Sequence, residues 1–76
     1  MPKMPVVTAQ KAIRAFKKAG FEEDHQTGSH CILKKPGHRH HLSVPFHKGK
    51  TLPKGTIHGL IKSADLSVDQ FIELLD

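Results

Sequence analysis

The sequence predicts an α+β domain in which one helix precedes a three-stranded antiparallel sheet and two helices follow it. Apolar residues recur at intervals of three and four near both ends of the chain, whereas residues 21–45 alternate between apolar and polar and are interrupted by glycine-containing turns. Helices packed on one face of such a sheet would leave its other face open. With 76 residues, we expect a single domain spanning 1–76, with a modest core.

The first and third predicted helices are marked by start or stop signals, and the second is predicted from the spacing of its apolar residues. The first runs from about residue 8 to 19, between an N-cap at Thr8 and the helix-ending Gly20. The second runs from about 53 to 64, and the third begins at Ser67 with a capping box. The apolar positions of the first two are Ala9, Ala12, Ile13, Phe16 and Ala19, then Ile57, Leu60, Ile61 and Ala64.

Three short strands are expected between the first and second helices. A weak, mostly polar strand covers 21–26 and ends in a tight turn at 27–28. A better strand covers 29–35, and a proline- and glycine-containing turn at 36–39 leads back into a strand at 40–44. The acidic run in the first strand is most simply solvent-facing.

The second turn suggests a register for the last two strands. If Lys35 faces His40 across four residues, the pairs that follow are Leu33 with Leu42, Cys31 with Val44, and His30 with Pro45. The first two pairs are apolar and suit a buried face. We therefore expect His30 on the opposite face, together with Lys34 and His41, near the place where His47 leaves the sheet.

The charge pattern indicates which kinds of partner the protein binds. Residues 25–64 hold all seven histidines and seven of the twelve Lys and Arg residues, but no Asp or Glu, and the whole chain has a formal net charge of +5. Such a protein seeks nucleic acid, an anionic surface or an acidic partner. With four Phe and no Trp or Tyr, an RNA reader that stacks bases on aromatic rings is disfavoured. The single cysteine, Cys31, excludes an internal disulfide and fits the cytoplasm, and we expect neither a signal peptide nor a membrane partner.

The chemistry that fits this composition is cleavage of RNA without a metal or other cofactor. The ribose 2′-hydroxyl is a built-in nucleophile, so an enzyme must supply a base, an acid for the leaving 5′-oxygen, and positive charge. Imidazole serves as either acid or base near neutral pH, and Lys side chains with backbone N–H groups supply the electrostatic part. A lone His near the start of a strand is nevertheless more often structural or merely exposed.

The remaining candidate residues are phosphate contacts. Gly28 permits a tight turn with close approach of a phosphate, and Ser29 can donate to the same group. Lys54 lies near the start of the second helix, where unpaired N–H groups favour an anion, although an ordinary capping segment is an equal alternative. Lys34 and Lys48 are the other candidate cations that would attract the phosphates of RNA.

Zinc binding by the histidine cluster at residues 38–41 is disfavoured. His38 and His40 could share a strand face, but His41 would point away, and no second cysteine or acidic ligand lies nearby in the sequence. Solvated turn histidines are the simpler interpretation, and His25 and His58 are expected on the surface. No metal site is therefore predicted.

Several short motifs, taken in order, resemble the HicA toxin family of mRNA interferases. They are Gly20-Phe21, Gly28-Ser29-His30, Val44-Pro45-Phe46-His47, Lys54-Gly55-Thr56 and Leu60-Ile61. The ordered set is much more specific than any one motif and covers most of the chain. The chain departs from the family at 25–27, where an Arg is often found, and at Cys31, where a bulkier residue is expected.

The resemblance implies an α-β-β-β-α fold like that of a double-stranded-RNA-binding domain, here with an extra C-terminal helix. It implies a type II toxin that cleaves mRNA independently of the ribosome and is blocked by a HicB antitoxin. The family's catalytic histidine falls on His30, with Gly28 and Ser29 completing its motif. His47 matches a second recurrent histidine. The alternatives are a non-catalytic RNA-binding module of the same fold, and a basic protein that only docks an acidic partner.

Overall fold

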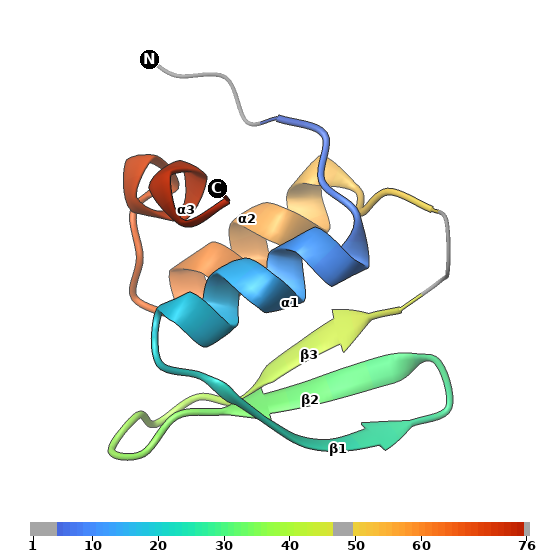
Figure 1. Cartoon of the computed structure of the whole chain (residues 1–76), viewed down its shortest axis with the longest axis vertical. Coiled ribbons are helices and arrows are strands. Elements are labelled where there is room, and N and C mark those ends of the chain that lie inside the picture. Colours follow the sequence, from blue (N-terminus) through green and yellow to red (C-terminus); the bar gives the residue numbers. More distant parts are fainter. Residues whose placement is uncertain (1–4, 47–49, 76) are drawn as a thin grey trace.

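The computed structural model describes residues 5–46 and 50–75. Its helices lie on one side of a single three-stranded sheet (Figure 1). The elements, in chain order, are α1 (Ala9–Lys18), β1 (Glu22–Thr27), β2 (His30–Lys34), β3 (Leu42–Pro45), α2 (Lys54–Ser63) and α3 (Val68–Leu74). This is the predicted α+β architecture, and the helix bounds differ from those expected by a residue or two.

The sheet is antiparallel in the order β1-β2-β3, and its register confirms the predicted pairing. The β2–β3 pairs are His30 with Pro45, Cys31 with Val44, Ile32 with Ser43, and Leu33 with Leu42. The third strand starts at Leu42 rather than at residue 40, because the chain makes a wider turn in which Gly37 has a φ of 79°. A residue without Cβ adopts that conformation at little cost.

Both predicted N-caps are present and explain where their helices begin. The Thr8 side chain accepts a hydrogen bond from the backbone N–H of Lys11 at 3.3 Å. At α3, Ser67 and Gln70 form the reciprocal capping box, with distances of 2.8 and 3.1 Å. These bonds satisfy backbone donors that the first turn of a helix leaves unpaired.

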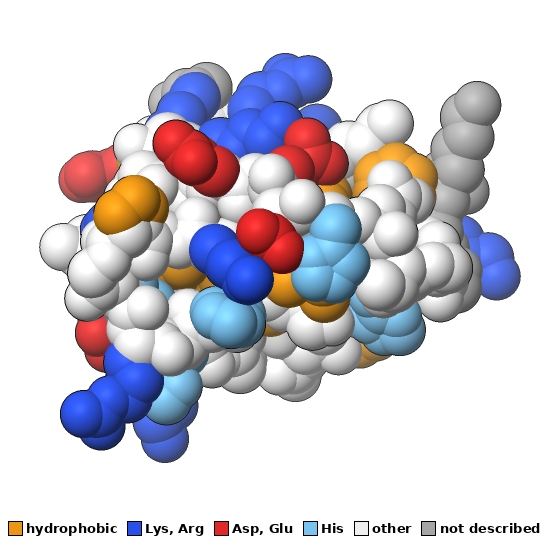
Figure 2. All heavy atoms as spheres, turned by 90° about the horizontal axis from the view of Figure 1, so that it is seen from below, with side chains coloured by type: hydrophobic (Ala, Val, Ile, Leu, Met, Phe, Trp, Pro, Cys, Tyr) orange, Lys and Arg blue, Asp and Glu red, His pale blue; other side chains and the backbone are white. Residues whose placement is uncertain are grey.

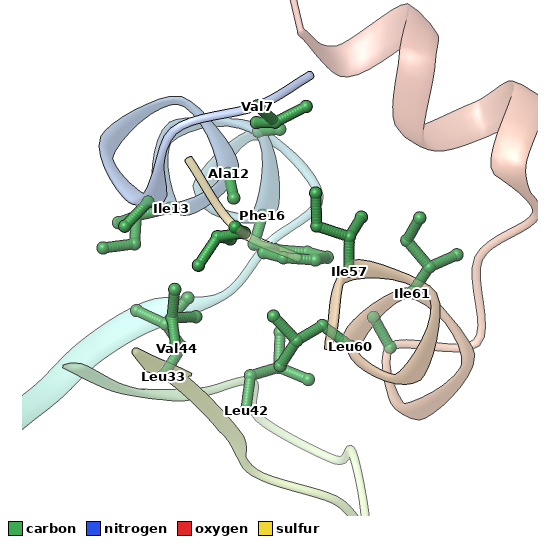
Figure 3. Packing of buried hydrophobic residues seen from close by; sticks show 14 of the residues in the cluster. Val7, Ala12, Ile13, Phe16, Leu33, Leu42, Val44, Ile57, Leu60 and Ile61 are labelled. Atoms are coloured by element: carbon green, nitrogen blue, oxygen red, sulfur yellow. The ribbon is translucent and has the colours of Figure 1, made fainter. Parts of the chain in front are cut away.

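The core lies between the helices and the inner face of the sheet. Phe16 of α1 points toward α2 and lies near the inner face of the sheet (Figure 3). Phe71 of α3 is fully buried, and its ring centroid lies 5.1 Å from that of Phe16. The third helix is therefore part of the core. Within the described residues, no helix is long and apolar enough to cross a membrane.

Strand β1 contributes no buried residue of its own and contains an irregularity. Glu23 pairs with Leu33, but the next pair joins His25 with Ile32, so Asp24 is an extra residue on β1. An extra residue of this kind is a β-bulge, which reverses the alternation of side chains beyond it. Every residue of β1 after Asp24 therefore faces the side opposite to the one that strict alternation predicts.

Candidate functional site

His30 lies at the beginning of β2, exposed on the sheet face that points away from the helices. Its neighbour Cys31 is 1% exposed on the opposite face, as the alternation of a strand requires. The turn before it depends on Gly28, which has a φ of 51°. The backbone N–H of Phe46 donates to the Ser29 carbonyl at 2.5 Å, which ties the chain leaving β3 to this turn.

The strand register determines which side chains share the open face with His30. Residues paired across neighbouring strands lie on the same face, and so do residues two apart along a regular strand. The residues on this face are Glu22, His25 and Thr27 of β1, His30, Ile32 and Lys34 of β2, and Ser43 and Pro45 of β3. Figure 2 shows histidine side chains gathered over this face around a lysine and a carboxylate.

Lys34 is not a solitary cation on that face. Its Nζ lies 3.2 Å from Oδ2 of Asp24, and the same oxygen contacts Nδ1 of His25 at 2.5 Å. The hydrogen bond from His25, followed by that from Lys34, lowers the pKa of the Asp24 carboxyl below its ordinary value. Residues 25–64 contain no acid of their own, but the bulge residue Asp24 places a carboxylate beside two of them, His25 and Lys34.

The acidic residue on the inner face makes a separate set of contacts. Glu23 accepts a hydrogen bond from Lys17 of α1 at 2.9 Å and one from the Cys31 thiol at 3.2 Å. The bond from Lys17 is the main reason that the pKa of Glu23 is lowered. Burial, and then the hydrogen bond to Glu23, raise the pKa of the Cys31 thiol to about 11. This thiol is consequently a packing group with little thiolate at neutral pH.

The structure corrects the expectation that His38 is a solvated turn residue. Its side chain is only 11% exposed, and its Nε2 donates to the Ser63 carbonyl at the end of α2 at 2.7 Å. Its ring also meets Phe21 edge to face, with centroids 5.3 Å apart. The sequence could not show this because α2 and the turn at 36–41 are distant in the chain. His25, His40, His41 and His58 are exposed, as expected.

Among the hollows on the described part of the surface, two shallow ones stand out, and His30 lines neither of these. One of about 300 Å³ lies at the far end of β2 and has mixed charge. Its lining is Glu22, Glu23, Asp24, Lys34, Lys35, Pro36, His38 and His41. The other, of about 230 Å³, lies beside α1 between Arg14, Lys17 and Phe46. Lys34 and His41 thus lie close together, as the register predicts.

The remaining candidates divide between described and undescribed parts of the chain. Lys54 is exposed at the first residue of α2, whose Pro53 N-cap makes no side-chain capping bond. His47 and Lys48 lie outside the described residues. Among residues 5–46 and 50–75, no three His, Cys, Asp or Glu side chains are grouped so as to hold a metal.

These observations define a small basic α+β domain with helices on one face of its sheet and a polar, histidine-bearing open face. A family model described as the HicA toxin of bacterial toxin–antitoxin systems matches residues 9–66. The chain therefore belongs to the HicA toxin family, and it is the toxin of a toxin–antitoxin pair, which implies a cognate antitoxin. Among curated proteins, none matches the chain.

Proposed function

We propose that this toxin is a ribosome-independent endoribonuclease that cleaves mRNA, with His30 as a catalytic residue. The observation that carries the proposal is the position of His30, exposed on the open sheet face directly after the Gly28-Ser29 turn. A phosphodiester can approach this turn closely because Gly28 has no Cβ and Ser29 can donate to a phosphate oxygen. The reaction takes place in the cytoplasm, where mRNA is present, and the whole chain acts as one domain.

The proposed reaction is an internal transesterification. A base takes the proton of the 2′-hydroxyl, the 2′-oxygen bonds to phosphorus, and the bond to the 5′-oxygen breaks as that oxygen receives a proton from an acid. His30 performs one of these two proton transfers. Lys54 at the start of α2 contributes positive charge near the phosphates, as do His47, Lys48 and the ion-paired Lys34.

The test is cleavage of a long mixed-sequence RNA by purified protein in EDTA. General acid–base catalysis contributes typically about 10²–10⁴-fold, so His30→Ala is expected to slow cleavage by that factor. The matched control is His40→Ala, which removes another exposed histidine beyond the opposite end of β2. Equal cleavage by His30→Ala and the parent would exclude His30 from the mechanism.

The same experiment separates the enzyme from a non-catalytic RNA-binding module. A basic binding module would hold RNA in a salt-dependent manner without cutting it. Binding of RNA by the parent without any cleavage would therefore favour that alternative. We further propose that the cognate antitoxin is of the HicB type and covers His30, so its addition should abolish cleavage.

A further inference from the structure

We propose that His25 is a second proton-transfer residue of this ribonuclease reaction and that Asp24 is its positioning residue. The inference rests on the proposed function, because transesterification requires both an acid and a base and His30 supplies one of them. His25 is available for the second role because its side chain is 51% exposed. Three features of the structure support this assignment: the bulge in β1, the contact between Asp24 and His25, and the register between β1 and β2.

The bulge brings His25 to the open face of the sheet. Glu23 lies on the inner face, where it meets Lys17 and Cys31. Strict alternation would place His25, two residues later, on that same inner face. Because Asp24 is an extra residue, His25 instead pairs with Ile32 and faces outward. Bulges next to active sites commonly re-aim a side chain in this way.

The bulge residue also holds the imidazole. Oδ2 of Asp24 lies 2.5 Å from Nδ1 of His25, so the carboxylate accepts the Nδ1 proton. A histidine bonded through one ring nitrogen has a defined tautomer and orientation, and its other nitrogen is left to exchange a proton with a substrate. The Lys34 ammonium, at 3.2 Å from the same carboxylate oxygen, keeps Asp24 in place.

The register brings His25 beside His30. Thr27 is the direct partner of His30, and His25 is the direct partner of Ile32, so the two histidines are diagonal neighbours on one face. Diagonal neighbours in an antiparallel pair lie about 7–8 Å apart, within reach of long side chains. A phosphate held between the two rings could meet His25 on one side and His30 on the other.

Together, His25 and His30 supply the base and the acid that the transesterification requires. One imidazole accepts the 2′-hydroxyl proton as the 2′-oxygen bonds to phosphorus, and the other, protonated, gives its proton to the departing 5′-oxygen. The products are a 2′,3′-cyclic phosphate and a 5′-hydroxyl. Neither an oxidant nor a metal takes part. Among the described residues of β1 and β2, the charged groups on the face of this pair are the Asp24 carboxylate, the Lys34 ammonium and the Glu22 carboxylate.

The test measures single-turnover cleavage of a mixed-sequence RNA by the full chain across a range of pH. His25→Ala is expected to lower the rate at saturating protein by about 10²–10⁴-fold and to flatten one limb of the pH profile. Added imidazole should restore part of that rate, since the site is exposed. The control, His40→Ala, should keep the parental rate and profile.

Asp24→Asn tests positioning separately from chemistry. Loss of an orienting partner should lower the saturating rate by about 10–100-fold. The protein concentration needed for half-saturation should fall at the same time, because Lys34 is then released to meet phosphate. A structural role for Asp24 would not divide the two measurements in this way, and circular dichroism and thermal unfolding would report a loss of fold.

The outcomes distinguish this inference from the proposed function. If His30→Ala abolishes cleavage while His25→Ala has the parental rate and pH profile, the contact between Asp24 and His25 is only a surface ion pair and the inference is overturned. If His47→Ala, and not His25→Ala, removes a limb of the profile, the inference is equally overturned. If the parent itself does not cleave RNA, the proposed function fails first.

Discussion

The turns before and after strand β2 each place a glycine close before a histidine, but the two histidines differ in accessibility. Gly28 precedes His30 and Gly37 precedes His38, and both glycines have positive φ angles, of 51° and 79°. His30 is exposed, whereas the His38 side chain is only 11% exposed and is bonded to the end of α2. A turn motif therefore positions a histidine locally, and the packing of distant helices decides whether that histidine is accessible to a substrate.

Replacing each of the two histidines by alanine should give the largest expected effect on stability. His38→Ala is expected to lower the free energy of unfolding by about 1–3 kcal/mol, because the Ser63 carbonyl loses its donor and Phe21 loses a ring contact. His30→Ala should change it by no more than about 0.5 kcal/mol. Urea unfolding measures both values, and equal losses would contradict the comparison.

The two glycines offer a matched pair for the turns themselves. Gly28→Ala and Gly37→Ala should each cost about 1–2 kcal/mol of stability from the left-handed backbone alone, since a Cβ added at either position meets no described atom within 4 Å beyond the neighbouring residues. Only Gly28→Ala should also slow RNA cleavage, because only that turn positions His30, the proposed catalytic residue. Gly28→Asn should cost less, since Asn tolerates this conformation. A cleavage defect in Gly37→Ala would count against the comparison.

The middle of β2 provides a test that depends on pH. The pKa of Cys31 is raised to about 11 in the folded protein, so the folded state favours the thiol. Stability from this group is complete below the ordinary thiol pKa of about 8.5 and is lost as the pH rises toward 11. Between pH 7 and 10 the loss should be about 1–2 kcal/mol, absent in Cys31→Ala. The thiol should also react slowly with iodoacetamide until urea unfolds the protein.

The smallest expected effect is on stability at acidic pH and depends on Glu23. Lys17 and, secondarily, Cys31 lower the pKa of Glu23, so the folded state favours the carboxylate. Its contribution to stability is present above about pH 4.3 and is lost as the pH falls through the folded-state value. Both partners of the ion pair are about half exposed, so the loss should not exceed about 0.5 kcal/mol and should vanish in high salt. Unfolding of Glu23→Gln at pH 7 and pH 3 measures it.

The order of elements could be predicted from the sequence because each signal acts over a few residues. The Thr8 and Ser67 caps, the apolar spacing of the helices and the glycine turns all depend on neighbours in the chain. The β2–β3 register was predictable too, since only one register puts Cys31 and Leu33 opposite Val44 and Leu42 on a buried face. The register of strand β1 could not be predicted in this way, because none of its residues is buried.

The sequence by itself determined the fold class, the family motifs and the placement of His30 on the outer face of the sheet. Only the tertiary structure decided that His38 is bound to α2, that Lys34 has Asp24 as a partner, and that His25 faces outward beside His30. The physical reason is that alternation, capping and turn formation are local. A bulge, an ion pair between strands and a helix that covers a turn all depend on which distant segments pack together.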